Sequence, residues 1–313
     1  MNKTNNFTLQ DTLFARTTQF FALLVLATLA GIIASLVMGA WPTLTQTGPK
    51  FFVSDDWDPV RKLFGGLAPV WGTLITATIA LLIAGPVSFG IAIFLTEMCP
   101  PVLKRPLGTA VELLAAIPSI IYGMWGLFIF APLFAQYQPT ISNTLGKLPL
   151  IGTLFQGPPM GIGVLCAGII LSVMVIPFIA SVMRDVFETT PPILKESAYA
   201  LGSTTWEVVW NVVLPYTKTG VVGGVMLGLG RALGETMAVT FVIGNAYNIS
   251  PQLFEAGNSI ASSLANEFNE ASEATHLSAL VTLGLTLFIL SFCVLAASRF
   301  MLSRMSAKEG KRT

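Results

Sequence analysis

Two ionisable residues, Arg231 and Glu235, interrupt a segment made largely of Gly, Val, Leu and Met. They stand four residues apart, about one helical turn, in the stretch GRALGETMAV. Arginine is always charged, and its planar guanidinium donates two parallel hydrogen bonds to oxyanions such as phosphate and carboxylate. The two residues therefore have the chemistry either to handle an anion or to form a structural ion pair in which each charge neutralises the other.

The composition indicates where these charges lie. Hydrophobic residues make up 53% of the 313 residues and charged residues only 11%, against about a quarter in ordinary soluble domains. A membrane-spanning helix needs roughly 20 mostly apolar residues, and six windows meet this requirement: residues 20–40, 70–95, 112–134, 161–182, 220–242 and 278–299. We therefore expect an all-α integral membrane protein with six transmembrane helices, in which both charges lie near the bilayer midplane.

The glycines of the fifth span predict which side of the helix carries the charges. At about 100° per residue, the glycines fall with Arg231 and Glu235 in one arc of about 160°. They are Gly220, Gly223, Gly224, Gly228, Gly230 and Gly234. Small residues let membrane helices approach closely, so this arc is expected to face protein. The opposite side, expected to meet lipid or another apolar helix, carries Val222, Val225, Leu229, Leu233 and Thr240.

Energetics favour a functional role for the two charges. An ionisable group at the bilayer centre costs at least about 2.5 to 3.5 kcal/mol and normally lines a polar cavity or has a partner. A buried ion pair barely offsets its own desolvation, so structure alone is a weak reason to keep one there. We therefore assign Arg231 and Glu235 to a substrate pathway.

Basic residues near span ends prefer the cytoplasmic side of a membrane. With the N-terminus inside, the outer loops hold four basic residues, Lys50, Arg61, Lys62 and Lys147. The cytoplasmic segments hold twelve: Lys3, Arg16, Lys104, Arg105, Arg184, Lys195, Lys218, Arg299, Arg304, Lys308, Lys311 and Arg312. We expect both termini in the cytoplasm, with a cytoplasmic segment 1–19, a membrane domain 20–299 and a basic tail 300–313. The first span is expected to be a retained helix, because its apolar run is too long for a signal peptide.

The remaining polar features have ordinary explanations. Cys99, Cys166 and Cys293 lack paired spacing and are expected to be buried small hydrophobes. His276 is expected to be a solvated loop residue, and Asp55, Asp56 and Asp58 lack the Gly and distal Glu of a calcium loop. We expect no metal site and no directly bound cofactor.

Two segments outside the fifth span carry local structural signals. Pro118 lies inside the third apolar window, where it is expected to bend the helix, and Glu112 lies at the cytoplasmic end of that window. The spacing of Ile260, Leu264 and Phe268 predicts a short amphipathic helix on the outer face.

The cytoplasmic segment 183–219 is expected to form a rigid two-helix loop. Pro191 and Pro192 suit a first helical turn, Gly202 suits its C-terminal cap, and Thr204 with Glu207 forms a capping box for the second helix. The second helix carries Trp206, Val209 and Trp210, and tryptophan is enriched in the centres of protein interfaces. A docking surface is one interpretation, and an amphipathic helix lying on the membrane is the other.

The stretch ESAYALGSTTWEVVWNVVLP resembles the EAA loop of binding-protein-dependent ABC importer permeases. Glu196, Ala198, Gly202, Leu214 and Pro215 match the motif, whereas Ser197 and Val212 are mild departures from its usual Ala and Ile. The resemblance implies the type I ABC importer permease fold and a loop, Trp206 included, that couples to an ATPase subunit. The chain has no GxxxxGK[ST] loop, so we expect it not to hydrolyse ATP itself.

The stretches AAIPSIIYGMWGLFIFAP and GRALGETMAVTFVIGN resemble the phosphate-specific branch of this family, in particular its C-type permease subunits. The resemblance implies an inorganic phosphate importer of the bacterial inner membrane. Its implied partners are an A-type permease, two ATP-binding subunits that hold ATP and Mg²⁺, and an outer phosphate-binding protein, with no nucleic acid. An A-type permease, a molybdate or sulfate permease and, in a different class, a secondary anion transporter remain as alternatives. A secondary transporter is less favoured because no convincing internal repeat occurs.

Glu235 has two open roles on this interpretation, because a carboxylate repels an anion unless another group intervenes. It either holds Arg231 in position until the substrate competes for the guanidinium, or accepts the proton that hydrogen phosphate carries and sulfate lacks.

Overall fold

The computed structural model describes residues 3–149 and 151–309, and the described chain is almost entirely helical. Within these residues six helices are long and apolar enough to cross a membrane: Gln10–Gln46, Leu67–Met98, Ser119–Leu145, Val164–Glu188, Thr205–Leu233 and Ala274–Arg304. The expected all-α architecture with six spans is confirmed. Lys311 and Arg312 of the expected basic tail lie outside the described residues.

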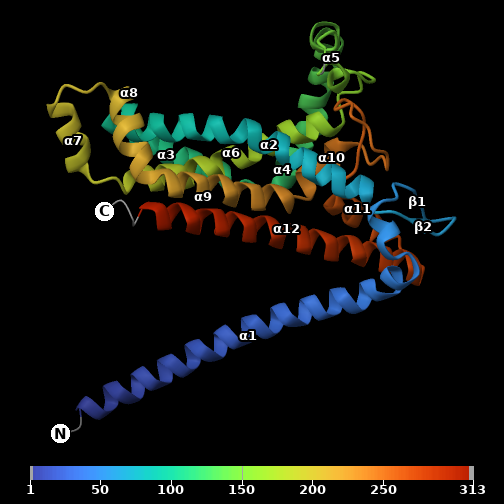
Figure 1. Ribbon diagram of the computed structural model, residues 1–313, viewed down its shortest axis with the longest axis horizontal. Coiled ribbons are helices and arrows are strands. Elements are labelled where there is room, and N and C mark those ends of the chain that lie inside the picture. Colours follow the sequence, from blue (N-terminus) through green and yellow to red (C-terminus); the bar gives the residue numbers. More distant parts are fainter. Residues whose placement is uncertain (1–2, 150, 310–313) are drawn as a thin grey trace.

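The elements follow one another along the chain as labelled in Figure 1. The first half contains α1 (Lys3–Gln46), η1 (Gly48–Phe52), β1 (Trp57–Asp58), β2 (Leu63–Phe64), α2 (Leu67–Ile93), η2 (Phe94–Met98), α3 (Pro101–Ala115), α4 (Ser119–Trp125), η3 (Gly126–Phe130) and α5 (Ala131–Leu145). The second half contains η4 (Gly152–Phe155), α6 (Val164–Glu188), α7 (Pro192–Ala200), α8 (Thr205–Val208), η5 (Val209–Val213), α9 (Leu214–Leu233), α10 (Met237–Ile243), α11 (Ile260–Glu267) and α12 (Ala274–Glu309). The segments η2, η3 and η5 are π-helical turns within longer helices.

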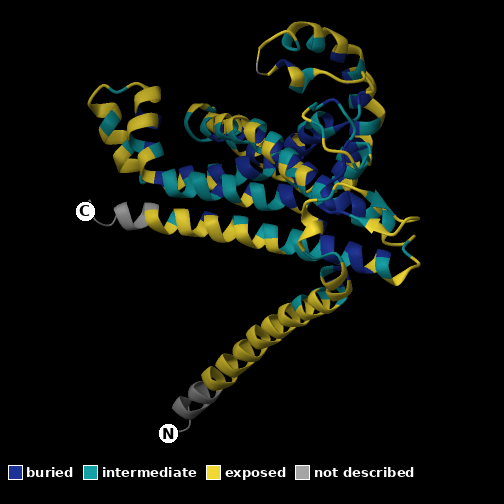
Figure 2. Ribbon diagram, turned by 45° about the vertical axis from the view of Figure 1, so that its right-hand side comes forward, coloured by how far each residue is buried: buried dark blue, intermediate teal, exposed yellow. Residues whose placement is uncertain are grey.

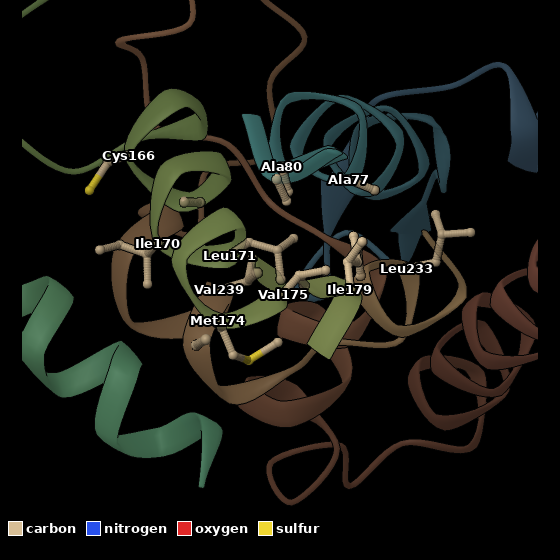
Figure 3. Close-up of a cluster of buried hydrophobic side chains, with 14 of the residues drawn as sticks. Ala77, Ala80, Cys166, Ile170, Leu171, Met174, Val175, Ile179, Leu233 and Val239 are labelled. Carbon is tan, nitrogen blue, oxygen red and sulfur yellow. The ribbon is translucent and has the colours of Figure 1, made fainter. Parts of the chain in front are cut away.

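Helix α6 is the centre of the bundle. Within its most apolar window 61% of the residues are buried, a larger share than in any other of the six spans of the described residues. Helix α2 packs along it, with α3, α9 and α10 around the remaining sides. Figure 3 shows the core where Leu171 and Val175 of α6 meet Ala77 and Ala80 of α2. Small residues on α2 permit this close approach.

Helix α1 stands apart from the bundle. It contacts α12 near the outer end, where Thr43 Oγ1 donates to Ser278 Oγ at 2.8 Å and Ser278 Oγ donates to the Gly39 carbonyl at 2.8 Å. From there α1 diverges from α12 (Figure 1), and none of its most apolar window is buried (Figure 2). Lipid or another protein must therefore cover this helix.

The third span begins later than the sequence predicts. Helix α3 ends at Ala115, and Pro118 is the N-cap of α4 rather than a bend inside a helix. Proline disfavours the helical conformation of the residue before it, which explains the break at this position. Glu112 consequently lies on α3 rather than at the end of a span, and its carboxylate accepts a hydrogen bond from Arg184 Nη2 at 2.6 Å.

The expectation that His276 is solvated is wrong. Its side chain packs against the Phe64 ring, and the residue is 9% exposed. The Glu267 carboxylate lies beside it and is also the acceptor for Trp57 Nε1 at 2.8 Å and for the Tyr247 hydroxyl at 2.5 Å. Burial raises the pKa of the Tyr247 phenol, which keeps the hydroxyl protonated as a donor. This cluster joins the β1–β2 hairpin to the outer ends of the bundle.

The expectations for the short outer helix and for the cysteines are each confirmed only in part. The short amphipathic helix is confirmed as α11, with Ile260 fully buried, although Phe268 just beyond its end is 51% exposed. Cys166 is buried as expected, whereas Cys293 is exposed on the surface of α12.

Gly72 on α2 is the position where a single methyl group should be most damaging. A Cβ there would lie 1.9 Å from the backbone oxygen of Asn258, and the adjacent Thr73 Oγ1 accepts a hydrogen bond from the Ile260 amide at 2.9 Å. We expect Gly72→Ala to push this loop off α2 and to lower stability by about 1–3 kcal/mol or more. The measurement is the thermal unfolding midpoint of the purified protein. Gly90→Ala, on the same helix with no atom within 4 Å of its Cβ position, should leave that midpoint nearly unchanged.

Candidate functional site

Arg231 lies in the last turn of α9 and is half-buried against α6. Its Cζ is 5.0 Å from the centroid of the Phe178 ring, a distance at which a ring face stabilises a cation. Phe178 lies near the middle of α6, which crosses the membrane from Val164 to Glu188. The guanidinium therefore lies midway along the central span, in agreement with the depth expected from the sequence.

The helix that carries Arg231 ends two residues later, which corrects the expectation of one continuous helix over residues 220–242. Helix α9 ends at Leu233, Gly234 is its C-cap, and α10 begins only at Met237. A break at membrane depth frees backbone groups from their helical partners and is tolerated only where protein or a water-filled cavity surrounds it. Discontinuous helices in transporters commonly form substrate sites. The break therefore makes this position a candidate site independently of the charges.

Glu235 lies within the break and is separate from Arg231. Its Oε1 accepts a hydrogen bond from the backbone amide of Ala238 at 3.3 Å, in the first turn of α10. That amide is one of the donors that a helix N-terminus leaves without a helical partner. In the described chain no ion pair joins Arg231 to Glu235. The structure thus gives no support to mutual neutralisation, nor to a Glu235 that holds the guanidinium in place.

The glycines of α9 face protein, as predicted. A Cβ at Gly220, Gly224 or Gly228 would lie 2.5, 3.2 or 2.4 Å from the nearest side-chain atom of α6, whereas Gly223 and Gly230 lie closest to α12. Helix α9 therefore fits between two helices. On the opposite side Leu233 is buried, and Val225 and Leu229 pack against the main core. Of the two alternatives for that side, another apolar helix is the correct one.

Two aromatic residues near Arg231 were not identified from the sequence. Phe178 lies under the guanidinium, and Tyr122 of α4 lies close enough for a coulombic interaction with it. The Tyr122 hydroxyl donates to the Leu114 carbonyl at 2.9 Å, across the break between α3 and α4. Both belong to other helices, so no spacing within the fifth span could reveal them.

The loop between the fourth and fifth spans, residues 189–213, has the caps that its sequence predicts. At the end of α7, Gly202 has φ +88°, its amide donates to the Tyr199 carbonyl, and the Ser203 amide donates to the Ala198 carbonyl. This is the Schellman arrangement, in which glycine accommodates the left-handed conformation. Thr204 and Glu207 form the reciprocal capping box at the start of α8. Both turns are fixed by hydrogen bonds, so the loop holds a defined shape.

The exposed surface of this loop is apolar, and only some of the residues that form it are expected from the sequence. Trp206 is 69% exposed, and its ring centroid lies 5.3 Å from that of Trp210. Leu201, not identified in advance, is 88% exposed just before Gly202. Val209, expected on this surface, is instead buried.

The residues of the motif occupy different parts of the loop. Glu196 is exposed on α7, Ala198 packs against the core, and Leu214 and Pro215 form the first turn of α9.

Six spans and a capped helical loop at one end form the fold of ABC importer permeases. A bacterial ABC transporter involved in alginate import has this fold, with a TM-score of 0.58 over 96% of both chains at 17% identity. The inward-facing MetNI methionine ABC transporter aligns with a TM-score of 0.56 over 80% of this chain and 99% of its own, at 20% identity.

The chain belongs to the family of binding-protein-dependent transport system inner membrane components, which matches residues 88–307. The matched range includes both the loop and the break. A relative in Pasteurella multocida (strain Pm70), named phosphate transport system permease protein PstC, is 59% identical over 96% of this chain and 94% of its own. A relative in Methanocaldococcus jannaschii, named a probable PstC, is 37% identical over 87% of both chains. The protein is thus a multi-pass inner membrane permease, a transporter subunit rather than an enzyme.

Proposed function

We propose that this chain is one permease subunit of an ATP-driven importer of inorganic phosphate and forms the translocation path with a second permease subunit. Phosphate is proposed as the substrate because the chain is 59% identical, over 96% of its length, to a relative named phosphate transport system permease protein PstC. The relatives give no support to the molybdate, sulfate or A-type alternatives. A secondary transporter is disfavoured by the fold, which is that of ABC importer permeases.

Arg231 is proposed to meet the anion on this path. Its guanidinium lies midway along the central span, beside the break between α9 and α10. An anion in a low-dielectric path needs a counter-charge, and the guanidinium supplies one with two donors in fixed geometry. Glu235 is proposed to hold the start of α10 through the Ala238 amide. The alternative role, accepting the proton of hydrogen phosphate, remains open to test with Glu235→Gln.

The energy is proposed to come from two ATP-binding subunits, which hold ATP and Mg²⁺ and dock on the loop containing Glu196, Gly202 and Trp206. A phosphate-binding protein is proposed to deliver the anion from the outer side. The loop projects from one end of the bundle, and the start of α1 and the end of α12 are directed toward that same end (Figure 1). If the loop meets a cytoplasmic ATPase, both termini are cytoplasmic, in agreement with the distribution of basic residues.

The test of the substrate is ATPase stimulation. The complete complex is reconstituted in liposomes, with the phosphate-binding protein on the side of the bilayer where the outer face of the permease lies. ATP hydrolysis is then measured with inorganic phosphate, sulfate or molybdate. We expect stimulation by phosphate only, accompanied by phosphate uptake. Stimulation by sulfate or molybdate equal to that by phosphate would contradict the proposed substrate.

A further inference from the structure

A buried ion pair ties the cytoplasmic loop to the second span. Lys195 Nζ of α7 lies 2.5 Å from Glu97 Oε1, and the two side chains are 19% and 5% exposed. Five further lysine and arginine ion pairs each include a carboxylate at least 38% exposed. The pair joins positions 98 residues apart in the chain.

Helix α7 has little other attachment to the membrane bundle. None of its residues is buried, and apart from Ala198, which packs against the core, it lies mainly against α8 and η5 of the same loop. It stands beyond the end of the bundle (Figure 1). A polar link on such a helix therefore has a larger share in fixing its position than it would have on a packed helix.

Glu97 belongs to a part of the bundle that is itself firmly joined. It lies in η2, the π-helical turn that ends α2, and α2 packs along α6. After η2 the chain enters α3, which packs against α6. The exposed Lys104–Glu188 pair, at 3.3 Å, also joins these two helices but adds little to their packing. Helices α2, α3 and α6 thus form one body at the cytoplasmic end.

We infer that the Lys195–Glu97 ion pair is the link through which displacement of the cytoplasmic loop moves the second span and the body around it. A buried pair suits this task because separating the charges leaves each one desolvated and without a partner, so the two elements resist moving apart. Exposed pairs lack this resistance, since water replaces the lost partner. The inference rests on the proposed function, in which an ATPase displaces the loop.

The experiment measures phosphate transported per ATP hydrolysed by the complete transporter in proteoliposomes. We expect Lys195→Met and Glu97→Gln to assemble with the ATPase subunit and to hydrolyse ATP, but to transport about tenfold less phosphate per ATP. The charge-swapped double variant, Lys195→Glu with Glu97→Lys, should recover most of this loss. Lys104→Met breaks a more exposed pair between α3 and α6 and should keep the ratio within about twofold of wild type.

A merely structural role lowers assembly, hydrolysis and transport together and leaves the ratio unchanged, which would overturn the inference. So would single variants with the wild-type ratio, or a swap no better than the single variants. A wild-type complex that hydrolyses ATP but carries no phosphate would instead refute the proposed function.

Discussion

Arg231→Ala is expected to lower phosphate uptake by about 10- to 100-fold, because hydrogen bonds to a charged group contribute about 1.5–3 kcal/mol and each 1.36 kcal/mol corresponds to tenfold in rate. The lost group is the guanidinium over Phe178, midway along the central span. Arg231→Lys keeps the charge but loses the planar fork, so it should recover part of the flux. Uptake of radiolabelled phosphate into proteoliposomes is the measurement.

The matched control is Arg299→Ala, which removes an exposed arginine from α12 at the end of a span. It should transport at nearly the wild-type rate. Binding of the ATPase subunit must be unchanged in both variants, so that lost flux is not lost assembly. Wild-type uptake by a fully assembled Arg231→Ala variant would remove Arg231 from the pathway.

The depth of Arg231 and the side of the helix on which it lies were predictable because both follow from local patterns. Hydropathy placed the fifth span, and the helical wheel placed Arg231 on the glycine side that packs between α6 and α12. The caps at Gly202 and Thr204 were predictable for the same reason, since a Schellman turn and a capping box involve residues only a few positions apart.

The break after Leu233 was not predictable from the same wheel. Gly234 continues the glycine periodicity of α9, so in the sequence it resembles another glycine that packs against a neighbouring helix. In the structure it is the C-cap that ends α9. Val209 shows a related difficulty. It begins the π-helical turn η5, whose wider turn shifts the register of side chains relative to a regular helix.

The burial of His276 depended on distant parts of the chain. Its neighbours Phe64 and Trp57 come from the hairpin before the second span, and its partner Glu267 lies at the end of α11. Such a cluster forms only when the outer loops are folded against one another. Spacing within one loop therefore gave no sign that the histidine was enclosed.

Trp206→Ala is expected to weaken binding of the ATPase subunit by about 30-fold, because truncating a tryptophan at an interface centre typically costs about 2 kcal/mol or more and 1.4 kcal/mol corresponds to tenfold in affinity. Trp206 is 69% exposed and forms an exposed apolar surface with Trp210 and Leu201, which is typical of an interaction site. The thermal midpoint of the isolated permease should change little. Titration of purified ATPase subunit onto the reconstituted permease pair measures the affinity.

The second interpretation of the loop, a helix lying on the membrane, predicts a different result for the same variant. In that case Trp206 reports a lipid environment by fluorescence before the ATPase is added, and Trp206→Ala leaves ATPase affinity unchanged. Trp41→Ala is the matched control, since Trp41 is 62% exposed near the end of α1. That end of α1 lies at the opposite end of the bundle from α7 and α8 (Figure 1). A loss of affinity in Trp206→Ala and Leu201→Ala but not in Trp41→Ala assigns the apolar end of the loop to the ATPase, because only side chains enclosed by that subunit lose buried area when they are truncated.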